Sequence, residues 1–230
     1  MDFAEASRVR IPAGAVTLDG KLCVPAPSAE LIVVVSTDSD FIWKRVNDRI
    51  ADDLKARGFA TLRVSLVTAA EIQIERHDGR YHLDVQFLAD RMCAVLGWLR
   101  HQAAWRMRPV GVVVSGTAAA GALTAAAHHP DQISGIVSLE GRADMAEDCL
   151  KHVHARTLLL AAGKDTHLAD LNRYAAANLP NARLEILQDA TYRFDEQRTL
   201  DDAVHRTVHW FAELFPPTSS HTNVEALCSP

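Results

Sequence analysis

The sequence is poor in aromatic residues and has no long hydrophobic run. Aromatic residues make up 6% of the 230 residues, although hydrophobic residues of all kinds reach 48%. The longest apolar runs, residues 31–35 and 158–162, have the length of a buried strand and are far too short to span a membrane. The composition is close to the globular average, which argues against a disordered, fibrous or membrane protein.

Cysteine is also scarce, and the four cysteines (Cys23, Cys93, Cys149 and Cys228) lie far apart in the sequence. None of their spacings matches the C-x-x-C pairs of a zinc site, so we expect reduced thiols and neither a bound metal nor another cofactor. The first residues are acidic where a secretory signal peptide is basic, and no apolar segment follows them. These features predict a cytoplasmic protein.

The chain has no basic excess. Its 29 acidic residues outnumber 24 Lys and Arg, which gives a formal net charge of -5. Proteins that bind the phosphate backbone of nucleic acids present a clustered basic face, so we expect neither nucleic acid nor a membrane as a partner. Eleven histidines are present, and their positions decide whether they serve acid–base chemistry.

Short apolar runs alternate with longer amphipathic patterns along the chain. Strands are expected over residues 31–36, 60–66, 110–115, 133–139, 157–162 and 183–187. Helices are expected over residues 42–57, 84–101, 118–128, 169–178 and 200–215. Continuous apolar strands separated by helices predict a mainly parallel sheet with helices on both faces, which is a doubly wound α/β fold.

The remaining segments complete this prediction. Asp19 and Gly20 predict the tight turn of an N-terminal hairpin, because an Asp-Gly pair supplies the positive φ that such a turn needs. The charged segment 71–80 is expected to form an exposed loop. No linker interrupts the pattern, so we expect one domain over residues 1–215, followed by a flexible C-terminal tail over residues 216–230.

In a sheet of this type, functional residues follow the carboxyl ends of the strands. The segment 109–123 joins an apolar strand to an alanine-rich helix, and it resembles the strand, sharp turn and helix of the α/β-hydrolases, specifically the dienelactone-hydrolase-like family. Further segments are similar to that family in the same order: residues 58–62, 79–84, 129–131, 141–144, 157–160, 163–165, 189–194 and 210–211. Together the similar segments span residues 8 to 215.

The resemblance implies an α/β-hydrolase fold with a nucleophile on the sharp turn, an acid after a later strand and a histidine base in a still later loop. In this chain Gly116 falls at the nucleophile position, Asp165 at the acid position and Tyr192 at the base position. Glycine has no side chain with which to attack, and a tyrosine with an ordinary pKa near 10 is a poor base at neutral pH. The resemblance therefore predicts a hydrolase fold without two of its three catalytic residues.

An alternative assignment keeps a working nucleophile. If the turn is shifted by one residue, Ser115 becomes the nucleophile, with Asp165 as the acid and His167 as a base. The shift puts Val113 and Thr117 where the turn needs small residues, and the alternation of side chains along a strand points Ser115 into the sheet. Two further histidines near the expected pocket are His77 and His82.

Polar residues that follow several strands predict a pocket for a small polar ligand. They are Ser36, Thr37, Asp38, Thr117, Glu140 and His167. We also expect the Tyr192 hydroxyl to donate a hydrogen bond to Asp165, which would satisfy the acid without a base. The leading interpretation is a non-catalytic protein that acts by binding a small ligand or by associating with a protein partner, and a third interpretation is a purely structural role in an oligomer. The alternative is a carboxylester or dienelactone-type hydrolase that uses Ser115.

Overall fold

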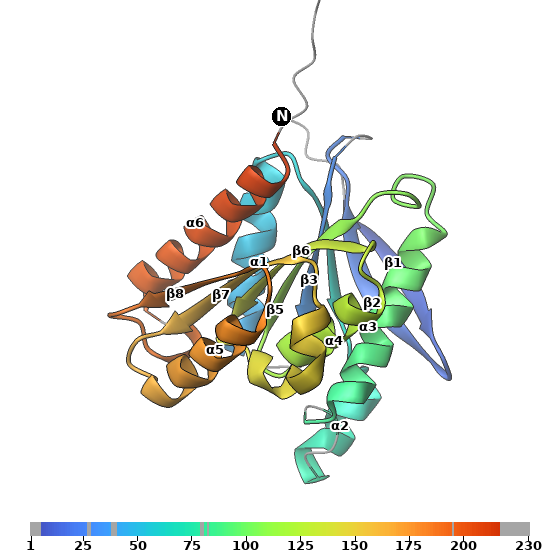
Figure 1. Cartoon of the computed structure of the whole chain (residues 1–230). Helices are drawn as coiled ribbons and strands as arrows, with labels where there is room; N and C mark the ends of the chain where they lie inside the picture. The colour runs from blue at the N-terminus through green and yellow to red at the C-terminus, as the bar shows by residue number, and fades with distance from the viewer. Residues whose placement is uncertain are drawn as a thin grey trace, which may run out of the picture.

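The computed structural model describes residues 6–26, 29–37, 41–78, 81, 83–194 and 196–216. These residues form an eight-stranded sheet with helices on both faces (Figure 1). The strand order is β1-β2-β4-β3-β5-β6-β7-β8. The pairs β1–β2 and β2–β4 are antiparallel, and the other pairs are parallel. The predicted doubly wound, mainly parallel α/β fold is confirmed.

The strands are β1 (Ser7–Ala13), β2 (Val16–Cys23), β3 (Leu31–Ser36), β4 (Ala60–Ser65), β5 (Val110–Ser115), β6 (Ile133–Leu139), β7 (Arg156–Ala162) and β8 (Ala182–Leu187). The α-helices are α1 (Phe41–Ala56), α2 (Ala69–Asp78), α3 (Val85–Arg100), α4 (Ala118–His128), α5 (Thr166–Asn178) and α6 (Gln197–Leu214). Two 3₁₀ helices, η1 (Ala143–His152) and η2 (Tyr192–Phe194), follow β6 and β8.

The central strands are buried on both faces, which explains their continuous apolar sequence. Val112 of β5 packs in the core layer that α3, α4 and η1 cover, whereas its neighbour Val113 packs in the layer under α1 and α6. Helix α4 is buried from Ala118 to Ala126. Its Gly121 allows close contact with α3, because a Cβ there would lie 2.6 Å from the Cβ of Leu88.

The N-terminal hairpin turns at a different place from the predicted one. Strand β1 pairs with β2 from Ser7 opposite Leu22 to Ala13 opposite Val16, so Asp19 and Gly20 lie inside β2. The predicted turn is therefore wrong. Gly14 has a φ of +67° and supplies the positive φ of the real turn, for which an Asp-Gly pair is not needed.

The predicted exposed loop over residues 71–80 is also wrong, since α2 covers most of it. The backbone N–H of Thr68 donates to the Glu71 carboxylate at 2.8 Å, and the N–H of Glu71 donates to the Thr68 hydroxyl at 3.2 Å. These two bonds form a capping box, which satisfies free N–H groups at a helix start. The nearly buried Glu71 also pairs with Arg91 of α3 at 2.6 Å, which fixes α2 to the domain core.

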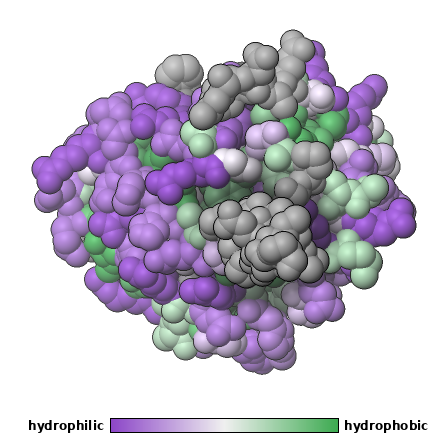
Figure 2. Space-filling view, turned by 90° about the horizontal axis from the view of Figure 1, so that it is seen from above, coloured by the Kyte–Doolittle hydropathy of each residue, from purple (hydrophilic) through white to green (hydrophobic). Residues whose placement is uncertain are grey.

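Seen from above, the surface outside the grey atoms is mostly hydrophilic, with small and separate hydrophobic areas (Figure 2). In the part of the chain that the structure describes, no helix is both long enough and apolar enough to cross a membrane. Residues 217–230 of the predicted tail lie outside the described residues.

Candidate functional site

The turn between β5 and α4 carries a glycine in a conformation that suits glycine best. Gly116 has a φ of +55°, in the left-handed region that other residues adopt only at a cost. A Cβ built on Gly116 would meet nothing within 4 Å, so a side chain would have room there. The Gly116 carbonyl accepts hydrogen bonds from the N–H of Arg142 at 2.9 Å and of Ala119 at 3.2 Å. The sharp strand-to-helix turn that holds a nucleophile in this type of fold is thus present, with a glycine at its centre.

The two residues beside Gly116 carry hydroxyl groups. Ser115 ends β5 opposite Leu139 of β6 and is 8% exposed. Because Val113 packs under α1 and α6, alternation along the strand assigns Ser115 to the same face of the sheet. Thr117 is the N-cap residue of α4, and its side chain makes no capping hydrogen bond.

Asp165 lies after β7, where the resemblance places the acid. It is half-buried and caps α5, because its Oδ1 accepts a hydrogen bond from the N–H of Leu168 at 3.0 Å. This bond gives the carboxylate a backbone donor that requires no histidine. His167 lies in the first turn of α5 and is exposed. Tyr192 begins η2 after β8 and is 44% exposed, and its hydrogen bond to Asp165 stays a prediction.

Glu140 is the most unusual residue of this region. It follows β6, is 1% exposed and has a φ of +50°, a left-handed conformation that is uncommon for glutamate. Its Oε1 accepts a hydrogen bond from the backbone N–H of Ala162, whereas its buried Oε2 has no partner among the described residues. Burial raises the pKa of Glu140 to about 7, and the nearby Asp165 charge raises it further while the Ala162 N–H opposes the shift. Backbone strain and a buried carboxyl group at one position are typical of functional sites.

The carboxyl ends of β5 to β8 are connected by hydrogen bonds. The N–H of Arg142, after β6, donates to Gly116, and Asn172 of α5 donates to the Gly141 carbonyl at 3.0 Å. The N–H of Lys164, after β7, donates to the Ala190 carbonyl, after β8, at 3.1 Å. These bonds hold the predicted nucleophile, acid and base positions together at the carboxyl ends of the strands.

The remaining predicted pocket residues have different outcomes. Ser36 ends β3 and donates a hydrogen bond to the Val64 carbonyl at 3.5 Å, and Thr37 is half-buried. Asp38 and His82 lie outside the described residues, as does the side chain of His77. Within the described ranges, no group of three His, Cys, Asp or Glu side chains could hold a metal ion.

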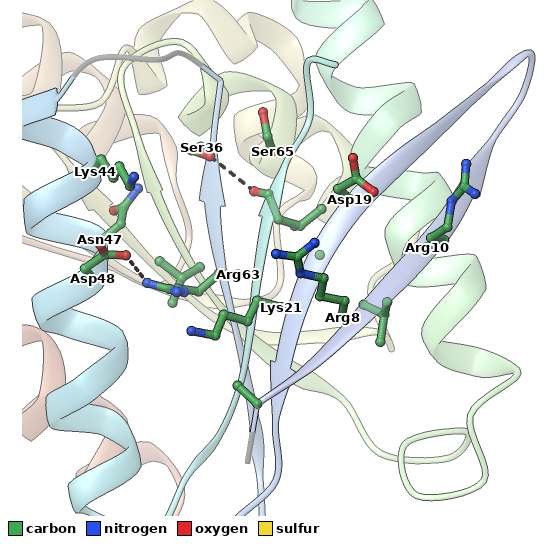
Figure 3. Close-up of a pocket in the computed structure, with 15 residues that line it drawn as sticks. Arg8, Arg10, Asp19, Lys21, Ser36, Lys44, Asn47, Asp48, Arg63 and Ser65 are labelled. Carbon is green, nitrogen blue, oxygen red and sulfur yellow. Dashed lines mark hydrogen bonds and ion pairs between the residues drawn. The ribbon is translucent and has the colours of Figure 1, made fainter. Parts of the chain in front are cut away.

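Ser36 lines a cavity of about 940 Å³ on the sheet face beside α1 (Figure 3). Five cationic and two acidic side chains line this cavity, which we call the basic groove. The cationic residues are Arg8, Arg10, Lys21, Lys44 and Arg63, and the acidic residues are Asp19 and Asp48. The sequence reasoning missed this groove. The alternation of Arg8 with Arg10 and of Asp19 with Lys21 could have indicated two strands with charged faces.

The fold and the order of these positions define an α/β-hydrolase-fold protein. A dienelactone hydrolase from Anabaena variabilis superposes with a TM-score of 0.85 and 29% sequence identity, and the match covers 91% of this chain and 97% of that one. The chain therefore has the fold of this dienelactone hydrolase. A dienelactone hydrolase-like promiscuous phosphotriesterase, P91 from metagenomic libraries, has a TM-score of 0.73 at 16% identity, with 93% and 99% of the two chains covered, and supports the fold alone.

A curated protein of Mycobacterium tuberculosis, present in strains H37Rv and CDC 1551 and provisionally named a phosphoribosyl transferase, is 33% identical to this chain over 226 residues. The match covers 92% of this chain and 50% of the relative. The chain thus spans about half the length of the curated relatives it matches. No family model matches the chain.

Proposed function

We propose that this protein is a pseudo-hydrolase: a dienelactone-hydrolase-like protein that acts by binding a small polar ligand or a partner and does not hydrolyse esters. The observation that carries this proposal is Gly116. It occupies the strand-to-helix turn with a φ of +55° and offers no nucleophilic atom. A glycine at this position relieves the backbone strain that a serine would have to tolerate there.

Two observations at the other positions support the proposal. One carboxylate oxygen of Asp165 accepts a hydrogen bond from the N–H of Leu168. Aspartate makes this bond at the N-cap of helices in general, so it gives Asp165 a structural role that needs no catalysis. Tyr192 stands at the position that the resemblance assigns to the base, and a phenol is a poorer general base than an imidazole. Without a base, a hydroxyl group at Gly116 would remain a weak nucleophile.

The second candidate function is ester hydrolysis through Ser115, with Asp165 as the acid and His167 as the base. The observation in its favour is that Ser115 borders the turn directly. Its 8% exposure is unfavourable for attack on a substrate, and His167 is exposed on α5.

The test is an ester assay on the purified protein with p-nitrophenyl acetate. We expect no turnover above background from the wild type or from Ser115→Ala. The variant Gly116→Ser restores the hydroxyl group of the nucleophile. The double variant Gly116→Ser with Tyr192→His restores a histidine base as well. The matched control is Gly116→Ala, which imposes the same backbone strain without a hydroxyl group. Wild-type turnover that Ser115→Ala abolishes would contradict the proposal and establish the second candidate.

We also propose that the protein acts in the cytoplasm as one domain over residues 1–215. The described cysteines, Cys23, Cys93 and Cys149, are free thiols, as expected in a reducing compartment. The strands of the single sheet come from residues 7 to 187. Limited proteolysis should therefore release no stable fragment that lacks part of this range. Two separately stable fragments would contradict a single domain.

A further inference from the structure

The basic groove contains a row of three cations that face one another across three strands. Arg8 of β1 lies opposite Lys21 of β2, and Lys21 lies opposite Arg63 of β4. Residues that are direct partners in a sheet place their side chains on the same face. Figure 3 shows Arg8, Lys21 and Arg63 side by side above that face, with Lys44 of α1 nearby.

Like charges directly opposite each other destabilise a sheet. Without a bound ligand, this row of cations therefore lowers the stability of the fold. Arg63 is the only member of the row with an ion pair in the described structure, and its partner is Asp48 of α1. The side chains of Arg8 and Lys21 make no hydrogen bond or ion pair with any residue of the described ranges. The adjacent pair, Arg10 opposite Asp19, is balanced in charge. Arg8 and Lys21 therefore leave two positive charges of the row without an acidic partner among the described residues.

The surroundings make this row exceptional in the molecule. The groove has five cationic and two acidic lining residues, although the whole chain has a net charge of -5. Four separate elements (β1, β2, β4 and α1) supply the cationic side chains. Partial burial lowers the pKa of Arg63, which indicates that this charge has lost part of its hydration. A bound anion would offset both the repulsion and the lost hydration.

We propose that the basic groove binds a small phosphorylated molecule, with its phosphate groups on the row of Arg8, Lys21 and Arg63. Guanidinium groups match the oxygen geometry of phosphate with paired hydrogen bonds, and a lysine adds a mobile point charge. The volume of about 940 Å³ is in the range of small-molecule pockets. This proposal is independent of catalysis at Gly116, because it depends only on the charged face beside α1.

The groove also indicates how such a ligand would lie. Its lining continues from the basic row to Ser36 and Ser65, which end the neighbouring strands β3 and β4. The uncharged part of a ligand would extend in that direction, toward the sheet edge that holds Gly116. Inorganic pyrophosphate consists of phosphate groups without an uncharged part, so it is the simplest probe of phosphate binding by Arg8, Lys21 and Arg63.

The experiment is isothermal titration of the full-length protein with pyrophosphate at low salt. We expect saturable binding that weakens about tenfold or more in Lys21→Gln and in Arg8→Gln, since each removes a charge-assisted contact. The matched control is Arg156→Gln, which removes an exposed cation from β7 at the other side of the sheet and should leave affinity within about twofold.

A second measurement separates binding from folding. Without ligand, Lys21→Gln should melt at the same temperature as the wild type or higher, because it relieves repulsion in the row. Pyrophosphate should then raise the melting temperature of the wild type more than that of Lys21→Gln. Absence of binding by the folded wild type, or equal weakening in Arg156→Gln, would overturn the proposal. Tighter binding of an octaglutamate peptide than of pyrophosphate would also overturn it, in favour of an acidic protein partner.

Discussion

Replacing Glu140 with glutamine tests whether the carboxyl group that follows β6, at the carboxyl ends of the strands, is buried and hard to ionise. The side chain is 1% exposed, one of its oxygens has no partner among the described residues, and its pKa is raised from 4.5 to about 7. At about 1.4 kcal/mol per pKa unit, ionising this group in the folded protein costs roughly 3 kcal/mol more than in the unfolded chain.

The direction of the pH dependence follows from that shift. The folded protein holds the Glu140 proton up to about pH 7, whereas the unfolded chain releases it near pH 4.5. The folded state therefore binds more protons between these values, and the free energy of unfolding falls as the pH rises from 4.5 to 7. Above pH 8 the full cost of the buried charge is present.

Glu140→Gln removes the charge while its amide oxygen can still accept the hydrogen bond from Ala162. Urea unfolding at pH 5 and pH 8 gives the effect of the substitution at each pH. We expect the free energy of unfolding of the variant, relative to that of the wild type, to rise by roughly 2.5 kcal/mol from pH 5 to pH 8. The matched control is Glu147→Gln, because Glu147 is exposed and also has a positive φ, of 46°. An effect of Glu140→Gln that is equal at both pH values, within about 0.5 kcal/mol, would refute the reasoning.

Three further predictions concern stability and are measured by urea unfolding. Gly116→Ala should lose about 1–2 kcal/mol because it forces a Cβ into the left-handed region, and an unchanged stability would mean that the turn relaxes. Gly135→Ala should lose about 1–3 kcal/mol, because its Cβ would overlap the side chains of Leu214 and Trp210. Gly97→Ala in α3, with open space around it, should gain about 0.5–1 kcal/mol. Equal effects of the two substitutions would contradict the packing argument. Arg91→Met should lose about 3 kcal/mol at pH 7 by leaving Glu71 unpaired. Burial raises the pKa of Glu71, but hydrogen bonds from Thr68 and the pairing with Arg91 outweigh it and lower the pKa, so this loss should shrink as the pH falls below 4.5.

The central part of the fold is readable from the sequence because its signals are local. Residues 110–115 and 133–139 form strands at their predicted bounds, since a fully buried parallel strand is continuously apolar. The helix over residues 118–128 also ends as predicted, before Pro130. The hairpin is different, because Asp19 and Gly20 fit a tight turn as well as a strand, here β2, which lies between β1 and β4. Only the pairing of residues 7–13 with β2 distinguishes the two.

The candidate site is less readable, because its features depend on contacts between distant segments. The positions of Gly116 and Asp165 follow from the resemblance, but the burial of Glu140 depends on how β7 packs against β6. The basic row depends on register: Arg8, Lys21 and Arg63 meet only because the hairpin turns at Gly14. A hairpin turning at Asp19 would have separated Arg8 from Lys21 and concealed the groove.

The most direct test of the pseudo-hydrolase assignment is intact-protein mass spectrometry after treatment with a fluorophosphonate, which labels activated serines. The account predicts no adduct on the wild type, because Gly116 has no hydroxyl group and Ser115 is nearly buried. A stoichiometric adduct that maps to Ser115 and disappears in Ser115→Ala would contradict it.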